Sequence, residues 1–155
     1  MPRTPDAIAR FLSGKRFAVA GVSRQPNQAA NAIFKKLAAG GYTVYPLNPH
    51  TTQIEGVTSY PDIASLPEPV DGVVVATHPD VAPEIARQAA DSGVRGLWFH
   101  RSFGRGSVSD AAVRLCGERG LECIVGGCPL MFVEPVDVGH RCIRWWLQRR
   151  GRVPR

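Results

Sequence analysis

The chain has 155 residues, enough for one domain of ordinary size, and its composition (44% hydrophobic, 21% charged) is that of a globular protein. It contains no apolar run near the roughly 18 residues that a membrane-spanning helix needs, and its N-terminus lacks a signal-peptide core. Its four cysteines have no CxxC spacing, which argues against a zinc knuckle and against a disulfide framework. We therefore expect a cytoplasmic protein with no membrane partner and no metal site.

The net charge of +6 is concentrated at the C-terminal end. Residues 141–155 contain six arginines and no acidic residue, and the remaining 13 basic residues equal the 13 acidic ones. Such a basic tail suits an anionic partner, either nucleic acid or an acidic subunit. A solvated helix end is the simpler interpretation.

The first half of the chain alternates between strand and helix patterns. A short amphipathic helix through Leu12, capped near Thr4, precedes the first strand. The apolar spacing then predicts, in order, a strand over 16–22, a helix over 27–39 ended by Gly40-Gly41, a strand over 42–47, a short excursion over 54–58 and a single turn over 63–66.

The second half continues the same alternation and adds one terminal helix. It predicts strands over 72–76, 96–99 and 121–125, helices over 80–92 and 108–119, and a final helix over 138–150. Regular alternation of this kind indicates a parallel sheet with crossover helices. We expect a single α/β domain, a three-layer sandwich with a mainly parallel five-stranded sheet, whose core covers about residues 12–131 and whose added helix and basic tail cover about 136–155.

The turn after the first strand, Gly21-Val-Ser-Arg24, is typical of a nucleotide-binding α/β unit. Gly21 permits a tight turn, and the amides at the start of the following helix would face a phosphate. The usual dinucleotide fingerprint is absent, because Ser23 stands where a second glycine belongs. The turn therefore predicts a phosphate site but not an ordinary NAD site.

The end of the second strand helps to discriminate between cofactors. NAD-binding proteins usually end this strand with an acid that accepts hydrogen bonds from the ribose, whereas this chain reads Leu47-Asn-Pro-His50. Loss of the acid removes repulsion against a phosphorylated ribose. NADP and coenzyme A (CoA), which carries a 3′-phosphate, both remain compatible with this end.

The segments that follow the five predicted strands are rich in Gly, Ser, Thr, Asn, His and Arg. In a parallel sheet they converge on one edge, where ligands bind. The candidate charge partners for a phosphorylated ligand are Arg24, His50, His78, His100, Arg101 and Arg105.

Several motifs in this order resemble one known family. They are Val19-Ala-Gly-Val-Ser-Arg24, Gly41-Tyr-Thr-Val-Tyr-Pro-Leu-Asn-Pro49, Ile54-Glu-Gly56, Val70-Asp-Gly-Val-Val-Val75 and, further on, Gly120-Leu-Glu-Cys-Ile-Val125 with Cys128-Pro129. Over about residues 12–131 the chain is similar to the small single-domain CoA-binding proteins and to the N-terminal domain of the succinyl-CoA synthetase α-subunit. The resemblance implies a Rossmann-like sheet that binds CoA at the strand ends, usually without a demonstrated reaction.

The resemblance also implies roles for particular positions. It puts Gly21, Val22, Ser23 and Arg24 at the CoA phosphates, and Asn48, Pro49 and His50 near the adenosine. Thr77 and His78 would line the ligand, and Cys128 matches a cysteine often found after the fifth strand. The chain departs from the family after Trp98, where it reads Phe99-His-Arg-Ser-Phe-Gly-Arg-Gly-Ser107, and in its added C-terminal helix.

Two other constellations allow chemistry or binding. Cys128 would become a nucleophile if His100 or His140 activated it, or would form a mixed disulfide with the CoA thiol; a buried, inert thiol is the simpler interpretation. Trp145-Trp146 among arginines resembles a single-stranded nucleic-acid surface, although such residues more often cover a sheet or a dimer contact.

Taken together, the residues predict a protein that binds CoA or an acyl-CoA and has no assigned catalytic residue. The first alternative is an enzyme, either an NADP-linked oxidoreductase or a subunit of an acyl-CoA ligase whose other parts are separate chains. The second is a regulatory module that uses the basic tail. A homodimer or a separate ligase-like subunit is the expected protein partner, and nucleic acid is not favoured.

Overall fold

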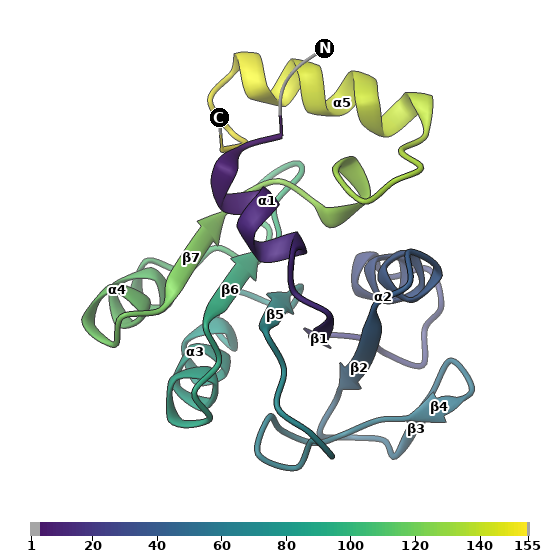
Figure 1. Cartoon of the computed structure of the whole chain (residues 1–155), viewed down its shortest axis with the longest axis vertical. Helices are drawn as coiled ribbons and strands as arrows, with labels where there is room; N and C mark the ends of the chain where they lie inside the picture. The colour runs from purple at the N-terminus through teal and green to yellow at the C-terminus, as the bar shows by residue number, and fades with distance from the viewer. Residues whose placement is uncertain (1–3, 155) are drawn as a thin grey trace.

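The computed structural model describes residues 4–154 and contains a five-stranded parallel sheet (Figure 1). Its strands lie in the order β2-β1-β5-β6-β7, and every neighbouring pair is parallel. Their bounds are β1 (Arg16–Ala20), β2 (Thr43–Leu47), β5 (Gly72–Val75), β6 (Gly96–Phe99) and β7 (Glu122–Val125). The predicted Rossmann-like α/β fold is confirmed.

Helices cover both faces of this sheet and give three layers (Figure 1). One face packs against α3 (Ala82–Asp91) and α4 (Asp110–Glu118). The other face packs against α1 (Asp6–Leu12), α2 (Ala29–Ala39), the short 3-10 helix η1 (Pro129–Met131) and α5 (Val138–Arg149). The expected excursion over 54–58 is a small antiparallel hairpin of β3 (Gln53–Ile54) and β4 (Val57–Thr58).

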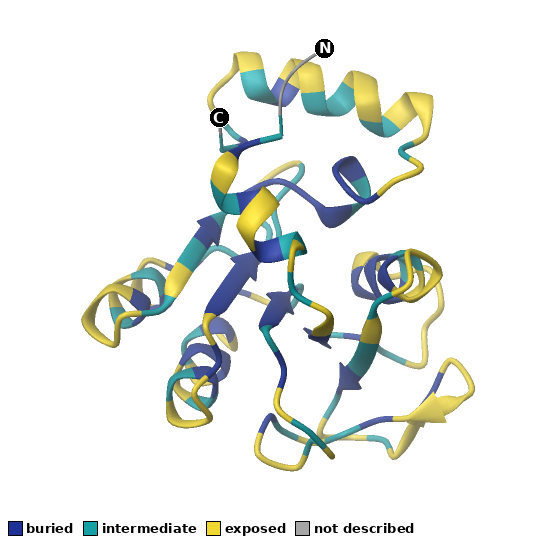
Figure 2. Cartoon of the chain, in the orientation of Figure 1, coloured by how far each residue is buried: buried dark blue, intermediate teal, exposed yellow. Residues whose placement is uncertain are grey.

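The central strands are buried on both faces, as Figure 2 shows in dark blue. Along β1, Phe17 and Val19 face the α2 layer, whereas Ala18 and Ala20 face the α3 layer. This two-sided burial explains why these strands are continuously apolar instead of alternating. On β6, Trp98 is fully buried and its indole Nε1 donates a hydrogen bond to the carbonyl of Gly126 (2.9 Å).

The beginning of α1 differs from the sequence prediction. The N-cap of this helix is Pro5, in extended conformation, and no side chain caps it, so the predicted cap near Thr4 is wrong. Thr4 lies one residue too early to reach the first-turn amides. Residues 1–3 of the predicted lead-in helix and Arg155 of the basic tail lie outside the described residues. Within residues 4–154, no helix is long and apolar enough to cross a membrane.

Candidate functional site

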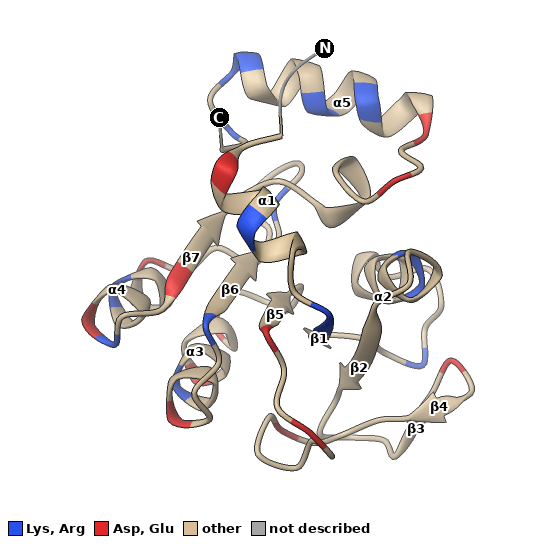
Figure 3. Ribbon diagram, viewed as in Figure 1, with Lys and Arg blue, Asp and Glu red and all other residues tan. Residues whose placement is uncertain are grey.

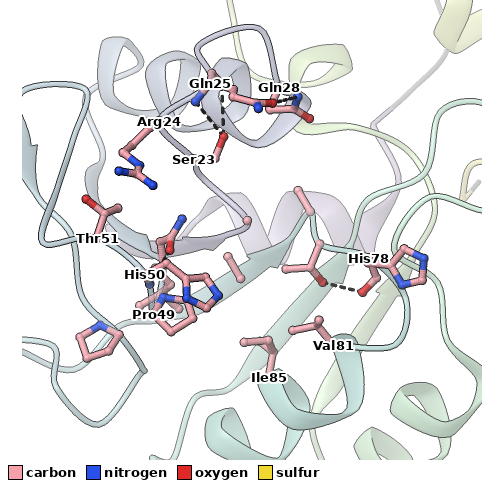
Figure 4. Close-up of a pocket in the computed structure, with 17 residues that line it drawn as sticks. Ser23, Arg24, Gln25, Gln28, Pro49, His50, Thr51, His78, Val81 and Ile85 are labelled. Carbon is pink, nitrogen blue, oxygen red and sulfur yellow. Dashed lines mark hydrogen bonds between the residues drawn. The ribbon is translucent and has the colours of Figure 1, made fainter.

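A cleft of about 710 Å³ opens at the carboxyl ends of β1, β2 and β5 (Figure 4). The chain leaves β1 toward β2 on one side and later returns to β5 on the other, so the cleft lies where the strand order reverses. Open α/β sheets bind ligands at this switch point, and the volume is in the usual range for a small-molecule site. The cleft is therefore the candidate site.

Gly21 shapes the first wall of the cleft. Its φ of +103° lies in the region that side chains rarely adopt, and a Cβ at this position would be 2.2 Å from the carbonyl oxygen of Ala76. Glycine is needed here for both reasons, because β1 and β5 approach closely where the turn leaves the sheet. The sequence prediction of a glycine-dependent turn agrees with this geometry.

Asn31 holds the turn in shape, and the sequence did not single it out. This fully buried residue on α2 accepts a hydrogen bond from the amide of Ser23 (3.0 Å) and donates one to the carbonyl of the same residue (2.7 Å). It also donates to Glu55 in the β3–β4 turn (2.9 Å), which in turn pairs with Lys35 (3.6 Å). The only sequence signal was a polar residue on the apolar face of the helix that follows the glycine turn.

The N-terminus of α2 opens toward the cleft without a cap. Its N-cap residue, Gln28, makes no side-chain capping bond, and the first turn carries no acid. Of the other α-helices described, α4 and α5 have side-chain caps (Ser109 and Asp137), and α1 and α3 carry an acid in the first turn (Asp6 and Glu84). The partial positive charge of the α2 N-terminus is therefore left for an external anion. Arg24 lines the same side of the cleft and adds a full charge (Figure 4).

The loop after β2 forms a second wall. Asn48 donates its side-chain amide to the carbonyl of Val22 (2.9 Å) and accepts a hydrogen bond from the amide of His50 (2.7 Å). The first bond ties this loop to the turn after β1, and the second is an Asx-turn that, with Pro49, fixes the course of the backbone. Asn48, Pro49 and His50 all line the cleft, as the sequence prediction requires.

The loop after β5 supplies the third wall. Thr77 and His78 line the cleft. Figure 4 shows His78 on the side opposite Arg24 and His50. The carbonyl of Thr77 accepts a hydrogen bond from the Ser107 hydroxyl (2.6 Å), which ties this loop to the next one. His78 lies 3.4 Å from Asp80 and is largely exposed.

Several predicted residues do not line this cleft. Val22 is fully buried beneath the turn, because its side chain packs in the apolar layer beside α2. The candidate charge partners in the loop after β6 also lie outside the cleft, because this loop folds toward the C-terminal end of the chain. There the Arg101 guanidinium donates a hydrogen bond to the carbonyl of Arg152 (3.4 Å). The predicted convergence of all six charged residues is therefore wrong for His100, Arg101 and Arg105.

Cys128 also lies outside the cleft, in the apolar layer beside η1. Burial raises the pKa of its thiol to about 11, so the thiol is protonated at neutral pH. Burial likewise lowers the pKa of His100, and the carboxylate of Asp137 hydrogen-bonds His140 (2.5 Å). The structure therefore does not support an activated Cys128 or its placement beside a CoA thiol. Among residues 4–154, no group of three or more His, Cys, Asp and Glu side chains could hold a metal ion.

Comparison with known proteins adds independent information about this cleft. The family model described as a CoA binding domain matches residues 15–134, which include all three cleft walls. The chain belongs to this CoA-binding domain family. The family resemblance inferred from the sequence motifs is thereby confirmed.

Relatives of this family member differ greatly in length. It is 25% identical over 114 residues to the uncharacterized protein YneT of Bacillus subtilis, covering 74% of this chain and 82% of that protein. It is 31% identical over 94 residues to acetate–CoA ligase [ADP-forming] II of Archaeoglobus fulgidus, and the match covers 59% of this chain but 14% of the ligase. A hypothetical protein from Pyrococcus horikoshii has a similar structure (TM-score 0.73, 27% identity), covering 83% of this chain and 93% of that one.

The family match also divides the molecule into two parts. It includes the whole sheet, α2 to α4 and η1, but it ends before α5. The cleft is therefore built from the part of the chain that the family model matches, whereas α5 lies outside the match.

Proposed function

We propose that this protein binds CoA or an acyl-CoA in the cleft at the ends of β1, β2 and β5, and that it does so without catalysing a reaction. The observation that carries the proposal is the uncapped N-terminus of α2, which opens beside Arg24 into the cleft of a CoA-binding domain. An uncapped helix terminus and a guanidinium together suit a pyrophosphate group.

The three walls suggest how the ligand would lie. The pyrophosphate would lie at Arg24 and the first turn of α2, next to Gly21 and Ser23. The adenosine would lie along Asn48, Pro49 and His50, where the missing acid leaves room for a ribose phosphate. The pantetheine arm would pass Thr77 and His78 toward the opening of the cleft. In this arrangement Val22 and Asn48 support ligand binding by holding the backbone of the loops after β1 and β2 in place.

Ligand binding is tested by calorimetric titration and by thermal shift with CoA, acetyl-CoA, NADP and ATP. CoA and acetyl-CoA should each raise the unfolding temperature, because they bind only the folded state. Arg24→Gln should weaken CoA binding by roughly tenfold or more, as expected for loss of one charge-assisted contact. Arg95→Gln, an exposed arginine remote from the cleft, is the matched control. A thermal shift with NADP and none with CoA would overturn the proposal.

A CoA-binding subunit of an acyl-CoA ligase is the second candidate. It is favoured by the match to an acetate–CoA ligase of which this chain covers only 14%, so the remaining parts would be separate chains. The protein alone should bind CoA yet form no ATP from acetyl-CoA, ADP and phosphate. ATP formation that depends on the chain alone would contradict the non-catalytic assignment.

A further inference from the structure

The outer face of α5 is the most apolar exposed surface in the described chain. Four of the six large apolar side chains that are exposed among residues 4–154 lie on this helix or on the adjacent loop after β6. They are Val138 (73% exposed), Phe103 (60%), Trp145 (49%) and Trp146 (38%). Phe103 and Trp146 lie together, with ring centroids 6.3 Å apart. We call this surface, with Cys142, the α5 face.

The helical spacing explains why these side chains are exposed. Leu147 is fully buried in the core, and Ile143 packs beside it on the inner side of α5. Val138, Cys142 and Trp145 follow one another at intervals of four and three residues and so share the outer side. Figure 1 shows α5 along one edge of the molecule, and Figure 2 shows exposed residues along much of this helix.

Arginines accompany the exposed aromatic rings. The guanidinium of Arg149 lies 4.2 Å from the ring centroid of Trp145, and that of Arg150 lies 4.2 Å from the ring centroid of Trp146. No acidic residue follows Asp137 at the start of the helix, and Figure 3 shows blue bands along α5 with red only before it. The α5 face is therefore apolar and positively charged at the same time.

We propose that the α5 face docks on the surface of an anionic phospholipid bilayer. A helix that lies in such an interface presents Trp, Phe and aliphatic side chains to the acyl boundary and Lys or Arg to the headgroups. Here an arginine stacks on each of the two exposed tryptophans, so a positive charge for the lipid headgroups lies beside each ring that would enter the acyl boundary. A shallow hollow of about 510 Å³ between Val138, Cys142 and the two tryptophans has room for part of an acyl chain.

The same observations argue against two other occupants. A second copy of the chain would bring two arginine-rich helices together, and one 12-residue helix offers less area than a stable interface needs. Single-stranded nucleic acid stacks on free aromatic faces, whereas the indole rings of Trp145 and Trp146 already carry guanidinium groups. Charge complementarity together with the exposed apolar side chains favours the bilayer.

The experiment uses the full-length protein and vesicles of two compositions, phosphatidylcholine alone and an equal mixture with phosphatidylglycerol. The protein should co-sediment with the anionic vesicles only, and the emission of its exposed tryptophans should shift to shorter wavelength. The double variant Arg149→Gln/Arg150→Gln should lower partitioning by roughly 25-fold, about fivefold for each arginine. Val138→Ser/Trp145→Ser should also abolish the emission shift.

Matched variants outside the α5 face control for charge and for exposed apolar area. Arg95→Gln/Arg114→Gln changes the net charge equally, and Val57→Ser removes another exposed valine; both should partition like the unaltered protein. CoA binding by every variant reports that the fold is retained. Equal partitioning of the α5-face and control variants would overturn the proposal, as would no binding to anionic vesicles. Tighter binding to single-stranded oligothymidine, or a dimer that Trp145→Ser dissociates, would also overturn it.

Discussion

The cleft and the α5 face are built in opposite ways. In the cleft, loop groups are fixed by hydrogen bonds, such as the two between Asn31 and the backbone of Ser23 and the one from Asn48 to the carbonyl of Val22. On the α5 face, the exposed groups are apolar rings and guanidinium groups held by the helix and by each other. A phosphorylated small molecule needs donors in fixed positions, whereas a broad anionic surface needs only area and charge.

The two regions also differ in how their helices begin. The first turn of α2 has no cap and no acid, whereas α5 begins at Asp137, whose carboxylate accepts a hydrogen bond from the amide of His140 (3.0 Å). The uncapped helix α2 faces the cleft, and the capped helix α5 carries the α5 face. A missing cap alone does not mark a ligand position, because α1 and α3 also lack a side-chain cap but carry an acid in the first turn (Asp6 and Glu84). Among the α-helices of residues 4–154, only α2 has neither a cap nor a first-turn acid, so its N-terminus is the one best suited to an external anion.

Gly21→Ala should have the largest effect of any single change, because it moves the wall shared by β1 and β5. The new Cβ would meet the Ala76 carbonyl at 2.2 Å in a left-handed conformation, so we expect a loss of about 4 kcal/mol in unfolding free energy. Gly41→Ala is the control: its φ is also positive, but nothing lies within 4 Å of the added Cβ. It should cost about 1 kcal/mol. If denaturant titrations showed the same loss of unfolding free energy for Gly21→Ala and Gly41→Ala, the close approach of Gly21 to the Ala76 carbonyl would not be what requires glycine.

Asn31→Ala should have the next largest effect on stability. Of the two surfaces, it should impair binding at the cleft and not at the α5 face. The substitution leaves the half-buried amide and carbonyl of Ser23 without the fully buried Asn31 side chain as partner, which should lower the unfolding free energy by about 2 kcal/mol. CoA binding should weaken by roughly tenfold, because the phosphate turn loses its support. Partitioning into anionic vesicles should be unchanged when measured below the unfolding transition.

Asn27→Ala is the matched control for this substitution. It removes an exposed asparagine from the loop just before α2 and should change stability by less than about 0.5 kcal/mol. If both variants bind CoA equally well, Asn31 does not position the turn.

The five strands and their parallel arrangement were predictable from the sequence because each signal is local, whereas the order of the strands came from the structure. Continuous apolar runs such as 72–75 mark buried strands, and the glycine after each helix marks its end. The walls at Gly21, Asn48 and Thr77 followed from the rule that parallel strands end at one edge. These inferences depended on pattern and topology, and neither requires knowledge of side-chain contacts.

The remaining errors arose where tertiary packing decides. The loop after β6 was expected at the cleft, but it turns toward the end of the chain, where Arg152 donates to the carbonyl of Gly104 (3.3 Å). Cys128 was expected beside the ligand and is buried under η1 instead. Asn31 was overlooked because its partners, Ser23 and Glu55, are 8 and 24 residues away and their approach depends on the folded hairpin.

Gln28→Asp should change stability and binding in opposite directions. An aspartate at this N-cap would accept a bond from the first turn of α2 and interact with the helix dipole, adding about 1 kcal/mol to the unfolding free energy. The same charge would repel the ligand phosphates, so CoA should bind roughly tenfold more weakly. Gln28→Ser, an uncharged cap, should add stability with a smaller loss of binding. A Gln28→Asp protein that binds CoA more tightly would show that no anion lies at this terminus.

Substitutions of Asp137 should have the smallest effect on stability, confined to the first turn of α5. Its hydrogen bonds to His140 lower the pKa of the carboxyl below its usual value, so the stability that it contributes is present above about pH 4 and is lost as the pH falls through the lowered pKa. Asp137→Asn keeps an acceptor for the cap but cannot titrate, so its stability should not show this acid loss. Asp137→Ala should fray the first turn of α5 at every pH and leave CoA affinity unchanged. Amide exchange of residues 138–141, followed from pH 3 to 6, would detect the difference; identical profiles for all three proteins would mean that the Asp137 cap does not hold this end of the α5 face.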